Sequence, residues 1–217
     1  MTDKYQKKRE KMVQKQLKRR GIKDEKVLEA FREVPRHEFV PEDKRDRSYE
    51  DRPLPIGYGQ TISQPYIVAE MIAALELESG DKVLEVGTGS GYAAAVLSRI
   101  VEHVYGLERI IELAEKGQKL CAGLGYDNVT IEPGDGTTGW PENAPFDGIL
   151  VSAAAPEVPD TLLEQLKEGA GLVIPAGSKY SQELLLIQKN RENKDKKSLG
   201  RVRFVSLIGE KGWDPGE

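Results

Sequence analysis

The stretch that decides the fold covers residues 82–92 and reads Lys-Val-Leu-Glu-Val-Gly-Thr-Gly-Ser-Gly-Tyr. Its first half is a short apolar run rich in β-branched residues, which predicts a buried parallel strand. Its second half places glycines at alternate positions (Gly87, Gly89 and Gly91), and an apolar helical pattern follows over residues 93–100. A strand that turns through glycines into a helix brings backbone N–H groups close to a ligand. The stretch therefore predicts a ligand-binding turn at the end of a central strand.

The spacing of the glycines and the residue before them indicate the kind of ligand. The spacing is G-x-G-x-G, whereas dinucleotide-binding turns use G-x-G-x-x-G. Glu85 precedes the glycines, and a carboxylate there would repel a pyrophosphate but could accept hydrogen bonds from an ammonium group. This favours a ligand with a positively charged amino-acid portion, such as S-adenosylmethionine, over a nicotinamide dinucleotide. A tight turn without a ligand is the alternative.

Length and charge bound the class of protein. The chain has 217 residues, which suffices for one sizeable α/β domain with a small N-terminal addition. We expect residues 1–50 to form N-terminal helices and an irregular segment packed on a catalytic domain of residues 51–217. The net charge of −4 gives no general attraction for nucleic acid, although residues 4–20 are strongly basic. A solvated helix face explains that basic run better than contact with RNA.

The numbers of cysteines and histidines and the hydropathy of the chain bear on disulfides, metal sites and location. The single cysteine, Cys121, excludes an internal disulfide and a cysteine-rich zinc site, and only two histidines are present. We therefore expect no metal site. No apolar run approaches ~18 residues and the N-terminus lacks a signal-peptide core, so we expect a cytoplasmic protein without membrane contact. No stretch predicts a long exposed apolar seam, so we expect a monomer.

Periodicity and breaker residues give the order of elements. Helices are expected over residues 4–20 and 24–35, followed by an extended, irregular segment over 35–55 and a helix over 66–77. Later strands are expected over 103–108, 128–132, 146–153, 169–175, 183–189 and 201–208, and later helices over 111–124 and 159–166. The charged link 189–200 has no helical apolar face, so the last two strands should form an antiparallel hairpin. The pattern predicts an α/β, Rossmann-like, mostly parallel sheet with a C-terminal hairpin and helices on both faces.

A polar loop before the helix at residue 66 is the second informative stretch. Residues 53–66 read Pro-Leu-Pro-Ile-Gly-Tyr-Gly-Gln-Thr-Ile-Ser-Gln-Pro-Tyr. Ser63 is well placed to cap the helix, and capping alone would explain a serine there. Capping does not explain Gly59, Gln60 and Thr61 beside it. A helix N-terminus with flanking hydroxyls is also a good receptor for a carboxylate.

Two acidic residues follow later strands. Glu108 ends the second predicted strand about 20 residues beyond the glycines, where a carboxylate can bind both hydroxyls of an adenosine ribose. A surface glutamate at a strand end is the alternative. Asp135 lies in a Gly-Asp-Gly turn over 134–136, which fits a polar side chain aimed at the exocyclic amine of adenine. Asp-Gly turns are common, so this second signal is weak.

With these residues in view, the chain from about residue 51 to residue 213 resembles the protein-L-isoaspartate O-methyltransferases, which repair isoaspartyl residues in damaged proteins. The glycine turn is shared by many methyltransferases, but the block Gly-Gln-Thr-Ile-Ser-Gln-Pro over 59–65 is much narrower. Further matching blocks lie at residues 134–136, 144–147, 162–169 and 172–177. Near the C-terminus the chain departs from the usual Val-Pro-Leu and reads Val-Ser-Leu over 205–207, so contacts there are not carried over.

The resemblance implies an activity and a set of site residues. The activity is transfer of the methyl group of S-adenosylmethionine to the free α-carboxylate of L-isoaspartyl residues, which leaves S-adenosylhomocysteine and starts repair through a succinimide. It places Ser63 at the catalytic centre, with Thr61, Ile62 and Ser63 against the substrate. The residues it assigns to the cofactor are Glu85, Gly87, Thr88, Gly89, Ser90, Gly91, Glu108, Asp135 and Gly136.

Two other functions stay open at this point. A methyltransferase acting on a small molecule or on RNA would share every cofactor residue, but it would leave the block over 59–65 unexplained. The chain also lacks the Asn/Asp-Pro-Pro-Tyr/Phe signature of amino-group methylation. A non-catalytic nucleotide-binding module is the second alternative, and intact Ser63, Glu85 and Glu108 argue against it.

Overall fold

A seven-stranded sheet forms the centre of the protein in a computed structural model, which describes residues 4–190, 194–214 and 216. The strands are β3 (Lys82–Val86), β4 (His103–Glu108), β5 (Val129–Pro133), β6 (Phe146–Val151), β7 (Leu166–Gly177), β8 (Gln182–Lys189) and β9 (Lys194–Val202). They lie in the order β5-β4-β3-β6-β7-β8-β9. All pairs from β5 to β7 are parallel, whereas β7–β8 and β8–β9 are antiparallel. The expected mostly parallel sheet with a C-terminal hairpin is confirmed.

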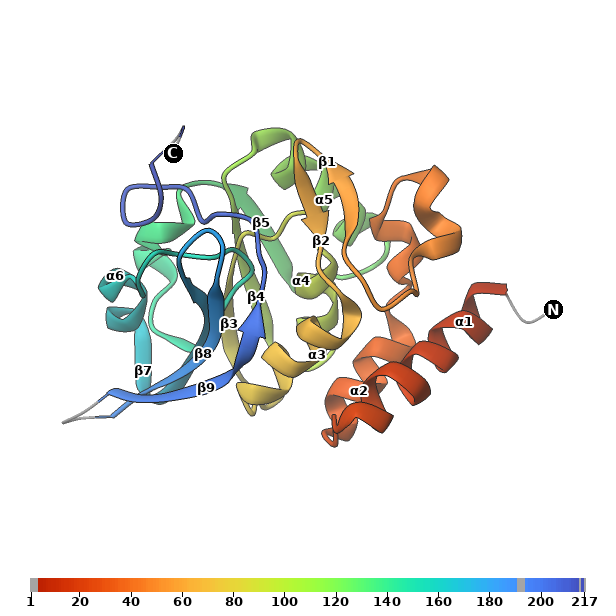
Figure 1. Ribbon diagram of the computed structural model, residues 1–217, viewed down its shortest axis with the longest axis horizontal. Helices are drawn as coiled ribbons and strands as arrows, with labels where there is room; N and C mark the ends of the chain where they lie inside the picture. Colours follow the sequence, from red (N-terminus) through yellow and green to blue (C-terminus); the bar gives the residue numbers. More distant parts are fainter. Residues whose placement is uncertain (1–3, 191–193, 215, 217) are drawn as a thin grey trace.

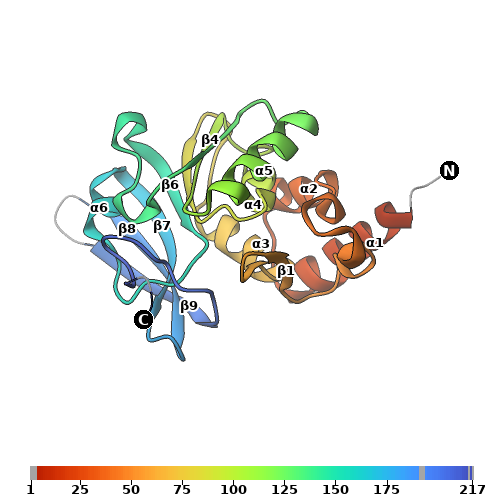
Figure 2. The same cartoon turned by 90° about the horizontal axis from the view of Figure 1, so that it is seen from above.

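Helices cover both faces of the sheet, as expected (Figures 1 and 2). On one face lie α3 (Pro65–Ala74), α4 (Tyr92–Leu97) and α5 (Ile111–Gly123), and on the other lies the short α6 (Asp160–Glu164). The sheet grows outward from β3 in both directions, and parallel crossovers are right-handed. Connections toward β5 therefore place their helices on one face, and the connection from β6 to β7 places α6 on the other.

The alternation of side chains in the central strand divides the core into two layers. In β3, Val83 points into the cluster that contains α4 and α5, while Leu84 and Val86 point into the cluster that contains α6. Successive side chains of a strand face opposite sides, so Glu85 shares the side of Val83. The acidic residue is therefore directed toward α4, beneath the glycine turn.

The N-terminal residues pack on the same core as α3 and α4. The helix expected over 4–20 is observed as α1 (Lys4–Met12), a π-helical turn η1 (Val13–Leu17) and a 3₁₀ turn η2 (Lys18–Arg20), and it stops at Gly21 with a φ of 107°. Its apolar stripe is fully buried at Met12, Val13 and Leu17. Asp24 caps α2 (Glu25–Glu33), and its carboxylate accepts hydrogen bonds from two backbone N–H groups.

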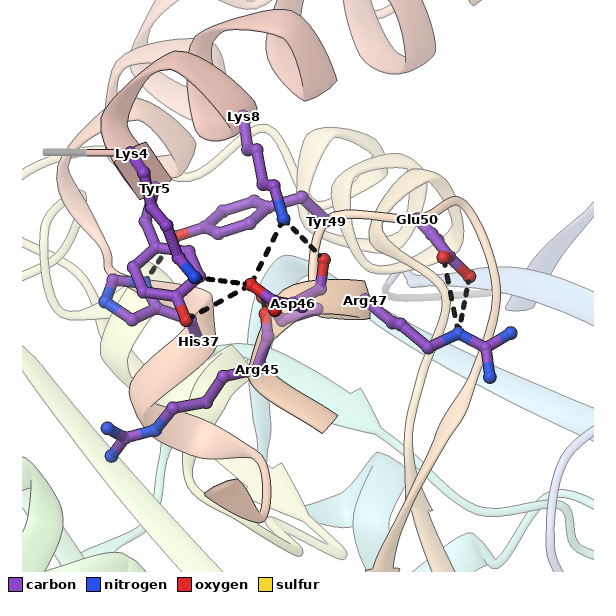
Figure 3. A network of polar contacts seen from close by, with 10 residues as sticks. Lys4, Tyr5, Lys8, His37, Arg45, Asp46, Arg47, Tyr49 and Glu50 are labelled. Carbon is purple, nitrogen blue, oxygen red and sulfur yellow. Dashed lines mark hydrogen bonds and ion pairs between the residues drawn. The ribbon is translucent and has the colours of Figure 1, made fainter. Parts of the chain in front are cut away.

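Part of the basic face of α1 is paired within the protein. Lys4 and Lys8 both lie within ion-pair distance of Asp46, at 2.8 and 3.4 Å (Figure 3). Tyr5, between them, stacks on the ring of His37 with 4.0 Å between the ring centroids. These contacts tie the first helical turns to the segment that precedes the sheet. The finding supports the interpretation of α1 as a structural element of the fold.

The segment over 35–55 differs from the expected extended conformation. It forms two 3₁₀ turns, η3 (Arg36–Phe39) and η4 (Glu42–Arg47), each beginning directly after a proline. The fixed φ of proline favours a helical start, and Phe39, Val40 and Tyr49 bury their side chains against the core. The polar loop expected over 53–66 is also more regular, because β1 (Leu54–Gly57) and β2 (Gln60–Ile62) pair as an antiparallel hairpin.

The last strand was predicted in the wrong place. It was expected over 201–208, but β9 occupies Lys194–Val202, most of which was expected to be a polar link. β9 is the edge of the sheet, where exposed charged side chains such as Lys196 and Lys197 are tolerated and no apolar pattern is needed. Residues 203–208 instead cross the carboxyl ends of the strands, where Ser206 forms a parallel bridge with Ala154. Of the link expected over 189–200, residues 191–193 lie outside the described residues.

Candidate functional site

The glycine turn at the end of β3 uses the backbone freedom that the sequence predicts. Gly87, Gly89 and Gly91 have φ values of 80°, 54° and 83°, a region that other residues rarely adopt. A Cβ at Gly91 would also lie 3.1 Å from the sulfur of Cys121 in α5. Gly91 therefore permits close packing of α5, while Gly87 and Gly89 border a narrow cleft above the sheet.

Glu85 is buried beneath this turn with one oxygen unsatisfied. Its Oε1 accepts a hydrogen bond from the hydroxyl of Ser152 at 3.1 Å. Its Oε2 has no partner among the residues that the structure describes, and neither does the hydroxyl of Thr88 nearby. Both residues line a small cavity together with Ser63 and Ser90. Burial raises the pKa of Glu85 to about 8. A donor with positive charge would satisfy the free oxygen and favour the ionised carboxylate.

Glu108 holds the glycine turn and borders the same cleft. One carboxylate oxygen accepts the N–H of Gly89 and the other accepts the N–H of Ile110, each at 2.9 Å. An ionised carboxylate oxygen has two lone pairs, so each oxygen can accept a further hydrogen bond from a ligand hydroxyl. The position predicted for ribose binding is therefore at the cleft, with capacity for two hydroxyl groups.

The Gly-Asp-Gly turn contributes backbone to the cleft. Gly136 lines it, and a Cβ there would lie 2.4 Å from Cγ1 of Val86, which explains the glycine. The carboxylate of Asp135 faces elsewhere: it accepts hydrogen bonds from the N–H and hydroxyl of Thr137, at 2.9 and 2.7 Å, and from the N–H of Glu210, at 2.7 Å. Burial acts to raise the pKa of Asp135, but these hydrogen bonds outweigh it and lower the pKa. The contact of Asp135 with adenine stays a prediction.

Ser63 follows β2 and precedes α3, and the structure removes the capping explanation for it. The N-cap position of α3 belongs to Gln64, and within the described ranges the hydroxyl of Ser63 accepts no hydrogen bond from the free N–H groups of the helix. The N–H of Tyr66, in the first turn of α3, donates instead to a carboxylate oxygen of Asp51, at 3.3 Å. The carbonyl of Ser63 accepts a hydrogen bond from Arg36 at 2.7 Å. The Ser63 hydroxyl is thus available to a ligand.

A second, wider cavity of about 770 Å³ adjoins the cleft. Thr61 and Ser152 line this cavity, the cleft and the small cavity above Glu85, and Ser63 lines the wide and the small cavity. Ile62 is buried and lines only the small cavity. The residues predicted for substrate thus lie where the three spaces meet, beside most of those predicted for the cofactor.

Several lining residues were not predicted from the sequence. Ser152 lies just after β6, where the rule that ligands sit at the carboxyl ends of parallel strands could have found it. Val205, Ser206, Leu207 and Ile208 line the cleft because their segment crosses the strand ends. The chain departs from the family's usual Val-Pro-Leu at residues 205–207, so no matching motif marked this segment, and its place depends on the bridge between Ala154 and Ser206. The remaining unpredicted residues of the wide cavity include Lys179, Arg201 and Arg203.

Comparison with known proteins decides the family. The family model described as protein-L-isoaspartate (D-aspartate) O-methyltransferase matches residues 7–212. The chain belongs to this family. The resemblance stated from the sequence is confirmed, and the match begins upstream of residue 51, so it includes the N-terminal helices.

Among the described residues, no group of three or more His, Cys, Asp and Glu side chains could hold a metal ion.

Individual relatives of the same family are similar over nearly their whole length. A protein-L-isoaspartate O-methyltransferase of Pelotomaculum thermopropionicum is 57% identical over 94% of this chain and 90% of its own. One of Syntrophobacter fumaroxidans is 51% identical over 97% of this chain and 98% of its own. A solved structure of the Plasmodium falciparum protein, in complex with S-adenosyl-L-homocysteine, superposes with a TM-score of 0.80 at 29% identity, covering 92% of this chain and 98% of that one.

Proposed function

We propose that this chain transfers the methyl group of S-adenosylmethionine to the free α-carboxylate of L-isoaspartyl residues in damaged proteins and peptides. The observation that carries the proposal is the meeting of the narrow cleft and the wide cavity at Thr61 and Ser152. The cleft carries the residues that suit a cofactor and the wide cavity has room for a segment of polypeptide, so a methyl group at the junction would face both. The family to which the chain belongs has this activity.

The residues around the cleft fit S-adenosylmethionine. The unsatisfied oxygen of Glu85 suits an ammonium group, and the two oxygens of Glu108 suit the ribose hydroxyls. Gly87, Gly89 and Gly136 line the cleft with backbone alone, and Thr88 offers a hydroxyl without a partner among the described residues. We propose Ser90, Gly91 and Asp135 as supporting residues of this site. When bound, the cofactor supplies a methyl group on a positively charged sulfur.

At the acceptor carboxylate, the main task of the protein is to hold the carboxylate in position. A carboxylate is ionised at neutral pH, so no general base is needed. Alignment of the carboxylate oxygen with the methyl carbon and exclusion of water supply most of the catalysis. We propose that the hydroxyls of Ser63 and Thr61 hold the carboxylate, with Ile62 packed beneath them. Neutral donors suit this role, since a tight ion pair with a lysine would weaken the nucleophile. The methyl ester then cyclises to a succinimide without the enzyme.

A pair of synthetic peptides tests the activity. The two peptides are identical except for isoaspartate or aspartate at one position, and each is incubated with methyl-labelled S-adenosylmethionine. We expect label to be released as methanol after mild base from the isoaspartyl peptide alone. Equal release from both peptides, or none from either while the cofactor is bound, would show that the acceptor is a different one.

We propose further that the protein acts in the cytoplasm as a monomer and without nucleic acid. In the part of the chain that the structure describes, no helix has the length and apolar character needed to cross a membrane. The pairing of Lys4 and Lys8 with Asp46 reduces the positive charge that α1 offers to a nucleic acid. Light scattering of the purified protein checks the monomer, and a mobility-shift assay with single-stranded RNA checks the expected lack of binding.

A further inference from the structure

Three cations line the wide cavity and give it a charge opposite to that of the whole chain. They are Lys179, from the turn between β7 and β8, Arg201, near the end of β9, and Arg203, just beyond it. None of the described residues that line this cavity is acidic. The chain as a whole carries a net charge of −4. The positive charge is therefore a local property of this wall.

The two arginines of this wall are not used in ion pairs of the fold. Arg201 and Arg203 are exposed, and neither forms an ion pair with an acidic residue within the described ranges. Some basic residues elsewhere are paired: Lys18 pairs with Glu25, and Arg99 pairs with Glu33. The side chain of Lys179 lies 4.9 Å above the ring of Trp213. The guanidinium groups of the wall are thus available to a ligand in the cavity.

The cations lie on a different wall from the hydroxyls at the reacting position. Thr61 and Ser152 line both the cleft and the wide cavity, whereas Lys179, Arg201 and Arg203 line the wide cavity alone. A volume of about 770 Å³ is in the range that holds a drug-sized ligand, so the space exceeds one isoaspartyl side chain. Groups flanking the reacting carboxylate would therefore lie against the basic wall.

We propose that Arg201, Arg203 and Lys179 form a specificity wall that favours isoaspartyl peptides with acidic residues beside the isoaspartate. The inference rests on the proposed function and adds the class of substrate sequence that the site prefers. An exposed ion pair contributes about a 1.5- to 5-fold gain in affinity. Two such pairs, at Arg201 and Arg203, give about a tenfold preference for acidic over basic flanks, and salt should weaken it.

Three isoaspartyl peptides that differ only in flanking residues test the wall. The positions on both sides of the isoaspartate are Glu, Gln or Lys, and kcat/KM is measured with the full chain at low salt. We expect the order Glu, Gln, Lys, with about a tenfold ratio between the extremes. In the double variant Arg201→Gln/Arg203→Gln the ratio should fall to about twofold. The ratio is the readout because a general loss of active enzyme does not change it.

A matched control separates local from global charge. The double variant Lys7→Gln/Lys11→Gln removes the same charge from the exposed face of α1. Neither lysine lines the wide cavity, the cleft or the small cavity above Glu85, so this variant should keep the tenfold ratio. A ratio that falls equally in both double variants, or that is absent in the unaltered chain, overturns the proposal. A further outcome also overturns the proposal: a single-stranded oligonucleotide inhibits the unaltered chain but not Arg201→Gln/Arg203→Gln, while the peptide ratio is the same in both. That outcome would favour a nucleic-acid groove. If even the Gln peptide is not methylated, the proposed function fails instead.

Discussion

The buried guanidinium of Arg36 donates a hydrogen bond to the main-chain carbonyl of Ser63, with 2.7 Å between the two atoms. A second hydrogen bond of the same length joins Arg36 to the carbonyl of Ser48, and the guanidinium lies 4.7 Å above the ring of Tyr92. Burial lowers the pKa of Arg36, yet an arginine stays charged at any physiological pH. A residue of the N-terminal segment thus fixes the loop that carries the proposed catalytic serine.

Replacement of this arginine should uncouple the loop from the fold. In Arg36→Met the carbonyls of Ser48 and Ser63 lose their donor, and a buried polar group without a partner costs about 1–3 kcal/mol. We expect the free energy of unfolding to fall by about 2–4 kcal/mol in urea titrations. We also expect kcat on the isoaspartyl peptide to fall by more than the affinity for S-adenosylhomocysteine. Arg36→Lys should recover part of both losses, and an unchanged kcat in Arg36→Met would contradict the positioning role.

Ser63→Ala should lower turnover while the cofactor remains bound. The hydroxyl has no hydrogen bond within the described part of the chain, so its removal should change the free energy of unfolding by less than about 0.5 kcal/mol. We expect a loss of about 10- to 100-fold in kcat, since one positioned hydrogen bond to a charged group is removed. Calorimetric titration with S-adenosylhomocysteine provides the control. A collapse of cofactor affinity together with activity would make Ser63 a structural residue.

Glu108→Gln should weaken cofactor binding nearly as much as Glu108→Ala. Both carboxylate oxygens accept backbone N–H groups, from Gly89 and Ile110, and an amide can replace only one of them. The other N–H would face an NH₂ group and disturb the glycine turn. We expect the dissociation constant of S-adenosylhomocysteine to rise at least about tenfold, which corresponds to about 1.4 kcal/mol. Unchanged affinity in both variants would remove Glu108 from the ribose site.

Cofactor binding should release a proton from Glu85. Its pKa is raised to about 8 by burial, so most of the carboxyl groups are protonated at pH 7. An ammonium group beside the free oxygen favours the ionised form and lowers this pKa. Binding of S-adenosylhomocysteine should therefore release up to about one proton at pH 7 and should tighten as the pH rises from about 6 to about 7.5.

The proton release is measured by calorimetry in buffers of different ionisation enthalpy. Glu85→Gln has no proton to release at this position, so its binding should show a flat pH dependence over the same range. Equal release in the variant and the unaltered chain would assign the proton to another group. No release from the unaltered chain would contradict an ammonium partner for Glu85.

Gly209→Ala should displace the C-terminal segment from the site. A Cβ at this position would lie 2.1 Å from Oδ1 of Asp135, whose carboxylate is held by Thr137 and by the N–H of Glu210. Such overpacking typically costs about 1–3 kcal/mol. We expect this loss in the free energy of unfolding and a fall in kcat/KM. Gly123→Ala in α5 is the matched control, because the added methyl group would meet open space and should not destabilise the protein.

The parts of the fold with a local signature could be predicted from the sequence. The strand-turn-helix at residues 82–92 carries β-branched residues, three glycines and an apolar helix start in one stretch, and the structure confirms the turn. Glu85 could be placed under that turn because strand alternation is local. β9 was misplaced because an edge strand needs no apolar pattern, and its charged residues resembled a loop.

Side-chain partners distant in sequence could not be predicted in the same way. Asp135 is bound to the N–H of Glu210, 75 residues further along, and no spacing rule connects the two. Arg36 lies beside Pro35 with no periodic pattern around it, although it contacts the loop of Ser63. Ser63 itself gave equal support to capping and to ligand binding. The two roles are distinguished by the N-cap position of Gln64 and by the carboxylate of Asp51, which accepts the N–H of Tyr66 in the first turn of α3.

The segment that crosses the strand ends belongs to both ligand spaces at once. Val205 and Ser206 line the cleft and the wide cavity. The carbonyl of Val205 accepts a hydrogen bond from the N–H of Ala154, and the N–H of Leu207 donates one to the carbonyl of Ala154, each at 2.8 Å. Any shift of this segment by one ligand alters the surface offered to the other. We therefore expect cooperative binding of cofactor and peptide. Thermodynamic reciprocity then requires that a peptide change the affinity for cofactor by the same factor by which cofactor changes the affinity for peptide.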